Sequence, residues 1–156
     1  MSLSDPDRAA PGQRLAWAAA RLRAAGHRDT RPRRQILHVL THAEGHLTVE
    51  GIHHQAAAAG PLDTSTVYRT LTIFERIGLV HTVLIGGRVT YGLADHPHAH
   101  AICDTCARVT ALRSTAWGHL AALAHGEANG FTSSGIIVRG QCDACLTGAG
   151  EATDQD

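Results

Sequence analysis

The chain has 156 residues, of which 44% are hydrophobic, so it can bury a core of useful size as one domain or two small ones. Its formal net charge is zero, but residues 1–93 have a net charge of +4 and residues 94–156 have −4. No apolar run approaches the roughly 18 residues that a membrane span requires, and the first residues lack a hydrophobic signal-peptide core. We therefore expect no membrane partner and a cytoplasmic location.

The first half of the chain predicts a disordered lead-in followed by four helices. Residues 1–12 contain two prolines, a glycine and several charges, which is typical of disorder. Thr30 and Thr48 are candidate N-caps, and Pro32 is tolerated in a first turn. The expected helices cover about residues 15–25, 31–42, 49–59 and 65–77.

The fourth expected helix has two distinct faces. Apolar residues recur at helical spacing along the face that we expect to be buried, at Val67, Leu71, Phe74 and Ile77. Polar side chains occupy the opposite face, at Ser65, Thr66, Tyr68, Arg69 and Thr72. An outward polar face that bears an arginine is suited to contacting nucleic acid.

A β-hairpin is expected directly after this helix. Two β-rich runs, residues 79–85 and 88–93, are joined by Gly86-Gly87, which is a strong hairpin signal. Helices followed by a hairpin predict a winged helix-turn-helix over residues 13–93, whose last helix enters the major groove of DNA. We expect base or backbone contacts from the fourth helix and backbone contacts from arginines elsewhere. The candidate DNA-binding residues are Ser65, Thr66, Tyr68, Arg69, Arg28, Arg31, Arg33, Arg34 and Arg88.

The second half predicts a small α/β domain. A histidine-rich hinge covers residues 94–99, and short strands are expected at 100–102, 107–112 and 135–139. A helix is expected between them at 115–128, although Gly118 and Gly126 weaken it. Residues 147–156 resemble a frayed acidic tail. A basic first half joined to an acidic second half fits a nucleic-acid-binding module with a sensing or assembly module, although ordinary surface charge would look similar.

All the cysteines of the chain lie in two C-x-x-C pairs, Cys103/Cys106 and Cys142/Cys145. Four thiolates complete the tetrahedral shell of a structural zinc ion and leave no open position for catalysis. Such an ion would join the beginning of the second domain to its end. Disulfides and redox chemistry are the alternatives, and thioredoxin-like redox use would need a helix directly after a C-x-x-C strand, which we do not expect here.

Several segments together resemble the ferric uptake regulator family. They are Arg28-x-Thr30-x-Pro-Arg33-x-x-Ile36-Leu37, Ser65-Thr-Val-Tyr-Arg-Thr-Leu71, Gly78-Leu79-Val80, Tyr91, His98-x-His100-x-x-Cys103-x-x-Cys106 and Gly140-x-Cys142-x-x-Cys145. The similarity covers about residues 14–146. It implies a homodimeric, metal-dependent repressor whose winged helix binds palindromic operator DNA and whose second domain, residues 100–146, pairs two subunits.

The resemblance also implies a second, regulatory metal site built from histidines. His98 and His100 match the family's hinge ligands, and His96 matches a third hinge histidine of a nickel-responsive subgroup. His46 matches a ligand from the DNA-binding domain, and His81 lies where zinc-responsive members place an Asp or His. A metal held by both domains would favour the domain arrangement that fits DNA. Whether His46 or His81 completes the site is left open.

Departures from the family pattern narrow the choice of metal. Gly92 and Ala111 replace the aspartates of peroxide-sensing members, and Pro97 and Ala99 replace the ligands of a further site found in some members. Ala94 stands where some zinc-responsive members have a cysteine, while Asp95 is a possible oxygen ligand. Imidazole-rich ligand sets favour zinc, nickel or iron(II) over manganese. We favour zinc as the regulatory metal and keep nickel, iron and manganese as alternatives.

The sequence therefore predicts an α+β protein with an N-terminal winged helix-turn-helix and a small α/β dimerisation domain containing a four-cysteine zinc site. The expected function is metal-responsive repression of zinc-uptake genes. A zinc enzyme is disfavoured because the cysteine site is closed and neither H-E-x-x-H nor G-x-S-x-G occurs. Two further classes of protein stay open, a metal buffer or chaperone and a regulator whose only metal is the structural zinc.

Overall fold

The computed structural model describes residues 8–96, 98–133 and 135–148. Contacts divide the chain into two compact units, and the first spans Arg8–His96. The described residues from His98 onward belong to the second unit. The expectations for residues 1–7 and 149–156 lie outside the described residues.

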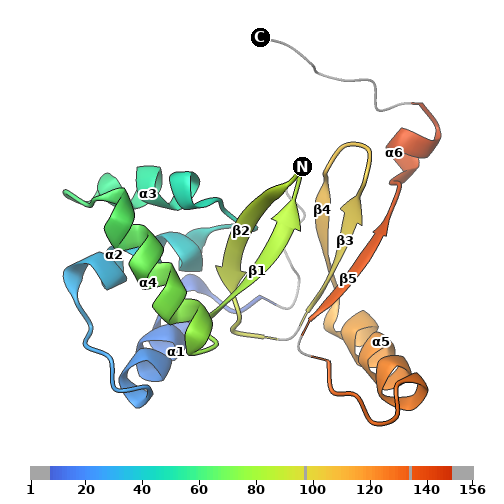
Figure 1. Ribbon diagram of the computed structural model, residues 1–156, viewed down its shortest axis with the longest axis horizontal. Helices are drawn as coiled ribbons and strands as arrows, with labels where there is room; N and C mark the ends of the chain where they lie inside the picture. The colour runs from blue at the N-terminus through green and yellow to red at the C-terminus, as the bar shows by residue number, and fades with distance from the viewer. Residues whose placement is uncertain (1–7, 97, 134, 149–156) are drawn as a thin grey trace. The chain divides into compact units, whose positions relative to one another are not determined.

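The first unit contains four helices followed by a two-stranded antiparallel hairpin (Figure 1). The helices are α1 (Pro11–Ala24), α2 (Arg31–His42), α3 (Val49–Ala57) and α4 (Thr64–Arg76). The hairpin strands are β1 (Val80–Ile85) and β2 (Arg88–Leu93). This order confirms the predicted winged helix-turn-helix.

Helix α1 begins earlier than the sequence suggests. We expected disorder up to residue 12 and helix from Leu15, but α1 starts at Pro11. Proline has a φ angle suited to the first helical turn, and its missing N–H would have had no partner there. The composition of residues 11–14 therefore misled the prediction at this boundary.

Local signals determine the other ends of the elements. The Thr48 hydroxyl accepts a hydrogen bond from Gly51 N at 3.2 Å, which caps α3. In the hairpin, Gly86 and Gly87 have φ angles of 55° and 76°, a conformation that only glycine adopts at little cost. This two-residue turn sets the register of β1 against β2, with Ile85 opposite Arg88 and Val80 opposite Leu93.

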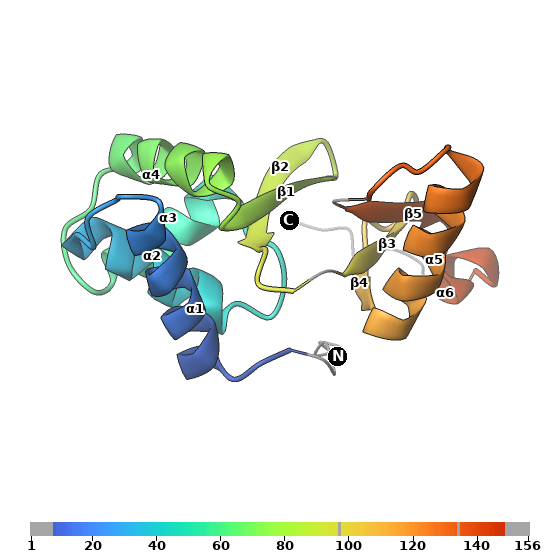
Figure 2. The same ribbon diagram turned by 90° about the horizontal axis from the view of Figure 1, so that it is seen from below.

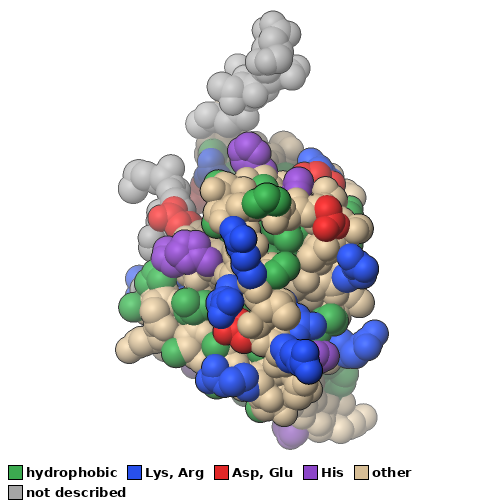
Figure 3. Space-filling model, turned by 90° about the vertical axis from the view of Figure 1, so that its left-hand side faces the viewer, with side chains coloured by type: hydrophobic (Ala, Val, Ile, Leu, Met, Phe, Trp, Pro, Cys, Tyr) green, Lys and Arg blue, Asp and Glu red, His purple; other side chains and the backbone are tan. Residues whose placement is uncertain are grey.

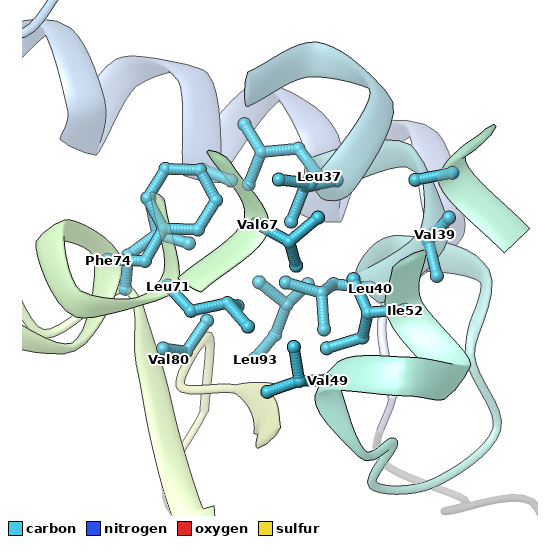
Figure 4. Packing of buried hydrophobic residues seen from close by; sticks show 14 of the residues in the cluster. Leu37, Val39, Leu40, Val49, Ile52, Val67, Leu71, Phe74, Val80 and Leu93 are labelled. Carbon is cyan, nitrogen blue, oxygen red and sulfur yellow. The ribbon is translucent and has the colours of Figure 1, made fainter. Parts of the chain in front are cut away.

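The core of the first unit lies between the helices and the base of the hairpin (Figure 4). Val67, Leu71 and Phe74 of α4 are fully buried, as the helical spacing predicts. They pack in one cluster with residues of α2 and α3 such as Leu37 and Ile52. Burying the side chain of each large apolar residue contributes about 1.5–3 kcal/mol, so this cluster holds α4 with its polar face outward.

The second unit is a three-stranded sheet with one long helix (Figure 2). Its elements are β3 (Ala99–Cys103), β4 (Val109–Leu112), α5 (Ser114–Glu127), β5 (Ile136–Gly140) and the single-turn helix α6 (Asp143–Leu146). The strand order is β4-β3-β5, with β3 antiparallel to β4 and parallel to β5. Helix α5 makes the crossover between parallel strands and packs against β3 and β5.

This unit leaves much apolar surface uncovered. Helix α5 has no buried residue, and Leu123 and Phe131 are 61% and 60% exposed. Edge strand β5 adds Ile137 and Val138, which are also exposed. Among the described residues, no helix has the length and apolar character that a membrane span needs.

Candidate metal sites and DNA-contacting surface

The four cysteines converge in the second unit because of the parallel pairing of β3 and β5. Cys103 ends β3 and lies opposite Gly140 of β5, and Asp104 N donates a hydrogen bond to Gly140 O at 2.7 Å. Cys106 follows in the turn after β3, while Cys142 and Cys145 lie at the start and within α6. Segments that are 36 residues apart at Cys106 and Cys142 are thus held side by side.

The cysteine geometry fits a tetrahedral zinc ion. The four Sγ atoms lie within 4.8 Å of one another, and Cys106 Sγ is 3.8 Å from Cys142 Sγ. With Zn–S bonds of about 2.3 Å, the edge of a thiolate tetrahedron is about 3.8 Å. All four cysteines are free thiols rather than disulfides. The cluster therefore has the donor set and spacing of a closed structural site.

Electrostatics within the cluster also favours a cation. Backbone N–H groups of Cys106 and Cys142 point at the Cys103 sulfur and lower the pKa of this thiol to about 6. In contrast, the hydrogen bond with Cys142 and burial raise the pKa of Cys145 to about 12. Four thiolates repel one another, so a divalent cation is needed to ionise all of them together.

One expectation about the cysteines is wrong. We expected no helix after either C-x-x-C pair, but Cys142 is the N-cap of α6. The helix is a single turn of four residues, too short to give a clear periodic signal in the sequence. The assignment to zinc therefore depends on the convergence of four thiols and not on the absence of a helix.

His46 and His81 form a close pair in the first unit. Their Nε2 atoms are 2.7 Å apart and the rings meet edge to face, with centroids 4.8 Å apart. Both side chains are partly exposed. His46 is held by the isolated β-bridge between its neighbour Leu47 and Tyr91 of β2, while His81 lies in β1. Two imidazole nitrogens at this distance can share a proton. With Zn–N bonds of about 2.0–2.1 Å, they would move to about 3.4 Å apart to donate to one tetrahedral ion.

His96 is oriented by a buried ion pair. Asp95 Oδ2 lies 2.6 Å from Arg14 Nε, and its Oδ1 lies 3.0 Å from His96 Nδ1. Burial alone would raise the pKa of Asp95, but the hydrogen bond from His96 and the nearby Arg14 guanidinium hold it well below its usual value. Both carboxylate oxygens are thus engaged, so Asp95 is placed to orient the His96 ring and not to bind a metal directly.

Sequence reasoning missed Arg14, although a signal was present. Arg14 shares one buried face of α1 with Ala18 and Leu22, and its NH1 also donates to Thr41 O at 2.8 Å. A cation at i, i+4 and i+8 spacing with core residues indicates a buried partner. The partner, 81 residues away, is not evident from the sequence.

His98 and His100 lie together at the beginning of the second unit. Their rings meet edge to face, with centroids 4.4 Å apart, as alternation along an extended segment predicts. His100 belongs to β3 and is only 4% exposed, whereas His98 precedes the strand and is partly exposed. The pair supplies two imidazoles from one short segment.

The candidate DNA-contacting residues of α4 lie on its outward face. Tyr68 is 49% exposed, and Arg69 is exposed with NH2 3.3 Å from Thr66 Oγ1. Asp63 caps the helix by accepting from Thr66 N at 2.8 Å, and it also accepts from the hydroxyls of Ser65 and Thr66. These hydrogen bonds lower the pKa of Asp63. Since its carboxylate already occupies the helix start, Tyr68 and Arg69 are better placed than Ser65 and Thr66 to meet a phosphate or base.

The other candidate arginines lie just before α2, in its first turn and at the start of β2. Figure 3 shows several Arg side chains (blue) with few carboxylates (red) on one face. Arg31 and Arg33 donate to backbone carbonyls, and Arg34 lies 3.6 Å from Asp29. Arg88, at the start of β2, pairs with Glu50 at 3.1 Å, and both side chains are 63% exposed. Exposed ion pairs are weak, so DNA phosphates can compete for these arginines. Arg28 is also exposed.

Comparison with known proteins gives one consistent family. A family model described as the Ferric uptake regulator family matches residues 24–133. A ferric uptake regulation protein from Campylobacter jejuni is 30% identical over 131 residues, covering 80% of this chain and 83% of that protein. The structure of a ferric uptake regulator from Pseudomonas aeruginosa with manganese has a TM-score of 0.67 and 27% identity, covering 80% of this chain and 97% of that one. A zinc uptake regulator complexed with zinc and DNA shares the fold, with a TM-score of 0.60, 23% identity and coverage of 90% and 98%.

Proposed function

Because the chain belongs to the ferric uptake regulator family, whose members are metal-responsive transcription regulators, we propose that it is a repressor of metal-uptake genes that responds to zinc. The observation that carries this proposal is the presence of two kinds of donor set in one chain. Four thiols form a closed cluster, and separate histidine pairs offer imidazoles alone. A closed site suits a permanent ion, whereas imidazole sites exchange their ion more readily.

We propose that the regulatory ion takes ligands from both units. The His46–His81 pair and the His98–His100 pair each supply two imidazoles, and two ligands leave zinc short of its four-coordinate shell. An ion that binds both pairs stabilises one arrangement of the units over others, which is the coupling that a metal-dependent repressor needs. Both Asp95 oxygens are already engaged by Arg14 and His96, so Asp95 does not add an oxygen ligand.

The donor set is the basis for choosing zinc. Imidazole nitrogens suit zinc, nickel and iron(II), whereas manganese prefers carboxylate and carbonyl oxygens. The names of similar proteins mention iron uptake, manganese and zinc, so membership of the family does not choose the metal. Nickel or iron(II) is the alternative within the same class of function.

We propose that DNA binds along α4 and the hairpin of a homodimer. The outward face of α4 presents Tyr68 and Arg69, and Arg88 lies beside the hairpin turn. A second copy of the chain is the proposed cover for the exposed apolar residues of α5 and β5, because β5 lies at the edge of the described sheet and edge strands readily pair with another chain. Two winged helices related by a two-fold axis would read a palindromic operator.

The test is metal-dependent DNA binding by a variant in which His98 and His100 are both alanine. DNA is first selected from random duplexes with the wild-type protein and zinc, and affinity is then measured by fluorescence anisotropy at fixed salt. The variant should remain a folded dimer but lose the zinc-dependent increase in affinity. His54→Ala, at an exposed position of α3 outside the candidate metal ligands and DNA contacts, is the matched control and should behave like the wild type.

Two outcomes would overturn parts of the proposal. Full zinc-dependent affinity in the double variant would exclude these histidines as regulatory ligands. Failure of the wild-type dimer to select any DNA with zinc, nickel, iron(II) or manganese would favour a metal buffer or chaperone. Titrating the four metals separately then ranks them by the increase in DNA affinity that each produces.

A further inference from the structure

We infer that Gly92 is a positioning residue whose missing side chain allows His46 and His81 to meet above strand β2. The two histidines come from segments 35 residues apart, on opposite sides of this strand. The inference deepens the proposed function where it concerns metal affinity. The contacts among Gly92, His46 and His81 all lie within the first unit.

The hydrogen-bond pattern places β2 in the middle of three extended segments. Tyr91 exchanges both backbone hydrogen bonds with Leu47, at 2.8 and 3.0 Å, so Leu47 lies on the side of β2 away from β1. On the other side, Gly92 lies directly opposite His81 of β1. Residue 92 is therefore flanked by His81 in one neighbouring segment and by the residue next to Leu47 in the other.

Side-chain alternation puts both imidazoles on the face that a side chain at position 92 would use. Residues directly opposite each other point to the same face, so His81 and position 92 share one. Leu47 shares the other face with Tyr91, and its neighbour His46 must then point to the face of position 92. The outer segments are separated by two strand spacings, about 10 Å, so the rings have to reach across the middle strand.

The space above Gly92 is filled by the His46 ring. A Cβ atom on Gly92 would lie 2.7 Å from His46 Nε2 and 2.8 Å from its Cδ2, closer than real Cβ atoms approach. The same Nε2 atom contacts His81. Gly92 does not have a positive φ, so its backbone accepts alanine without strain. The conflict introduced by a side chain is therefore with the end of the His46 ring, which can swing away from His81 without unfolding the hairpin.

The consequence is a donor set without a carboxylate at this position. A residue with a side chain at position 92 and the observed His46 ring cannot occupy the same space. With glycine at position 92, the donors on this face of the hairpin are the imidazoles of His46 and His81, and residue 92 adds no carboxylate. Such a donor set favours metals that prefer nitrogen ligands.

The experiment compares Gly92→Ala with Gly45→Ala in the full chain. Gly45 precedes His46, also lacks a positive φ, and has nothing within 4 Å of an added Cβ, so it is a matched control. The cysteine cluster is first loaded with zinc, and further Zn²⁺ is then titrated by calorimetry against a competing chelator. Gly92→Ala should weaken binding of this second ion by about 10- to 100-fold, as loss of a positioning group commonly does. Gly45→Ala should bind like the wild type.

A double-mutant cycle with His46→Ala separates positioning from general damage. Without the His46 ring, Gly92→Ala has nothing to displace and should have no further effect on zinc affinity. An equal loss in the presence and absence of the ring, or wild-type affinity in Gly92→Ala, would overturn the inference.

A metal-free measurement distinguishes failure of this inference from failure of the proposed function. Ring ¹⁵N chemical shifts report the contact between His46 and His81, with resonances assigned from the single alanine variants. Gly92→Ala should shift both rings toward the values of isolated imidazoles, and Gly45→Ala should not. If the wild type bound no second ion, these shifts would still decide the role of Gly92, and unchanged shifts would refute it.

Discussion

Replacing Arg14 by methionine is expected to destabilise the first unit strongly. The Arg14 and Asp95 side chains are each only 6% exposed, their Nε–Oδ2 distance is 2.6 Å, and Arg14 also donates to Thr41 O. Methionine fills a similar volume but leaves the Asp95 carboxylate buried without its cation. Removing one member of a buried pair costs about 3–5 kcal/mol, mainly because the remaining charge is uncompensated.

The assay is urea unfolding followed by the fluorescence of Trp17 in α1, with the other tryptophan, Trp117, replaced by phenylalanine in all proteins. With a slope of about 1.5 kcal/mol/M, the expected loss lowers the urea midpoint of Arg14→Met by about 2–3 M. Arg88→Met is the matched control, because its pair with Glu50 is mostly exposed and should contribute little that is measurable.

A second change tests whether the buried charge is the cause. Adding Asp95→Leu to Arg14→Met removes the uncompensated carboxylate, so the double variant should be more stable than Arg14→Met alone. The reasoning is refuted if Arg14→Met shifts the midpoint no more than Arg88→Met. It is also refuted if the second substitution lowers stability further.

Three further outcomes are expected. Cys142→Ser should lower the zinc content, measured by mass spectrometry, by about one ion per chain, and Asp143→Asn should not; full zinc content would contradict a four-thiolate site. Because the folded-state pKa of Asp63 lies below the unfolded value of 3.8, its stabilising effect is complete above this value and is lost as the pH falls through the folded pKa. The difference in urea midpoint between wild type and Asp63→Ala should therefore shrink in acid, and a constant difference would exclude the cap. Arg69→Ala should weaken binding to the selected DNA by about 10- to 100-fold. Arg76→Ala, in the last turn of the same helix, is the control and should change the affinity little. Equal losses in the two variants would contradict a specific role of Arg69 in DNA binding.

The helices and the hairpin of the first unit were predictable because their signals are local. Helical spacing identified the buried face of α4, and Gly86-Gly87 identified the hairpin turn. Such patterns depend on residues within one or two turns of each other. Prediction was wrong where local composition was ambiguous, at the start of α1 and at the single turn of α6.

The convergence of the four cysteines was predictable from the sequence for a different reason. Two C-x-x-C pairs in one chain rarely serve a purpose other than metal binding. The residue types alone therefore predicted that the pairs come together, without knowledge of the fold. The histidines gave a weaker signal. Twelve occur in the chain, and imidazole is common on surfaces as well as in metal sites. Spacing within residues 96–100 and the family resemblance selected candidates without showing how each ring is oriented.

The sequence by itself determined the type and order of the elements and the chemistry of the donors, because periodicity, turn residues and ligand type are properties of short segments. Only the tertiary structure decided that Arg14 neutralises Asp95, that Asp95 orients His96, and that Gly92 leaves room for His46 beside His81. These relations join residues far apart in the chain, and strand register and packing create them. A missing side chain, such as that of Gly92, has meaning only when the atoms that occupy its space are known.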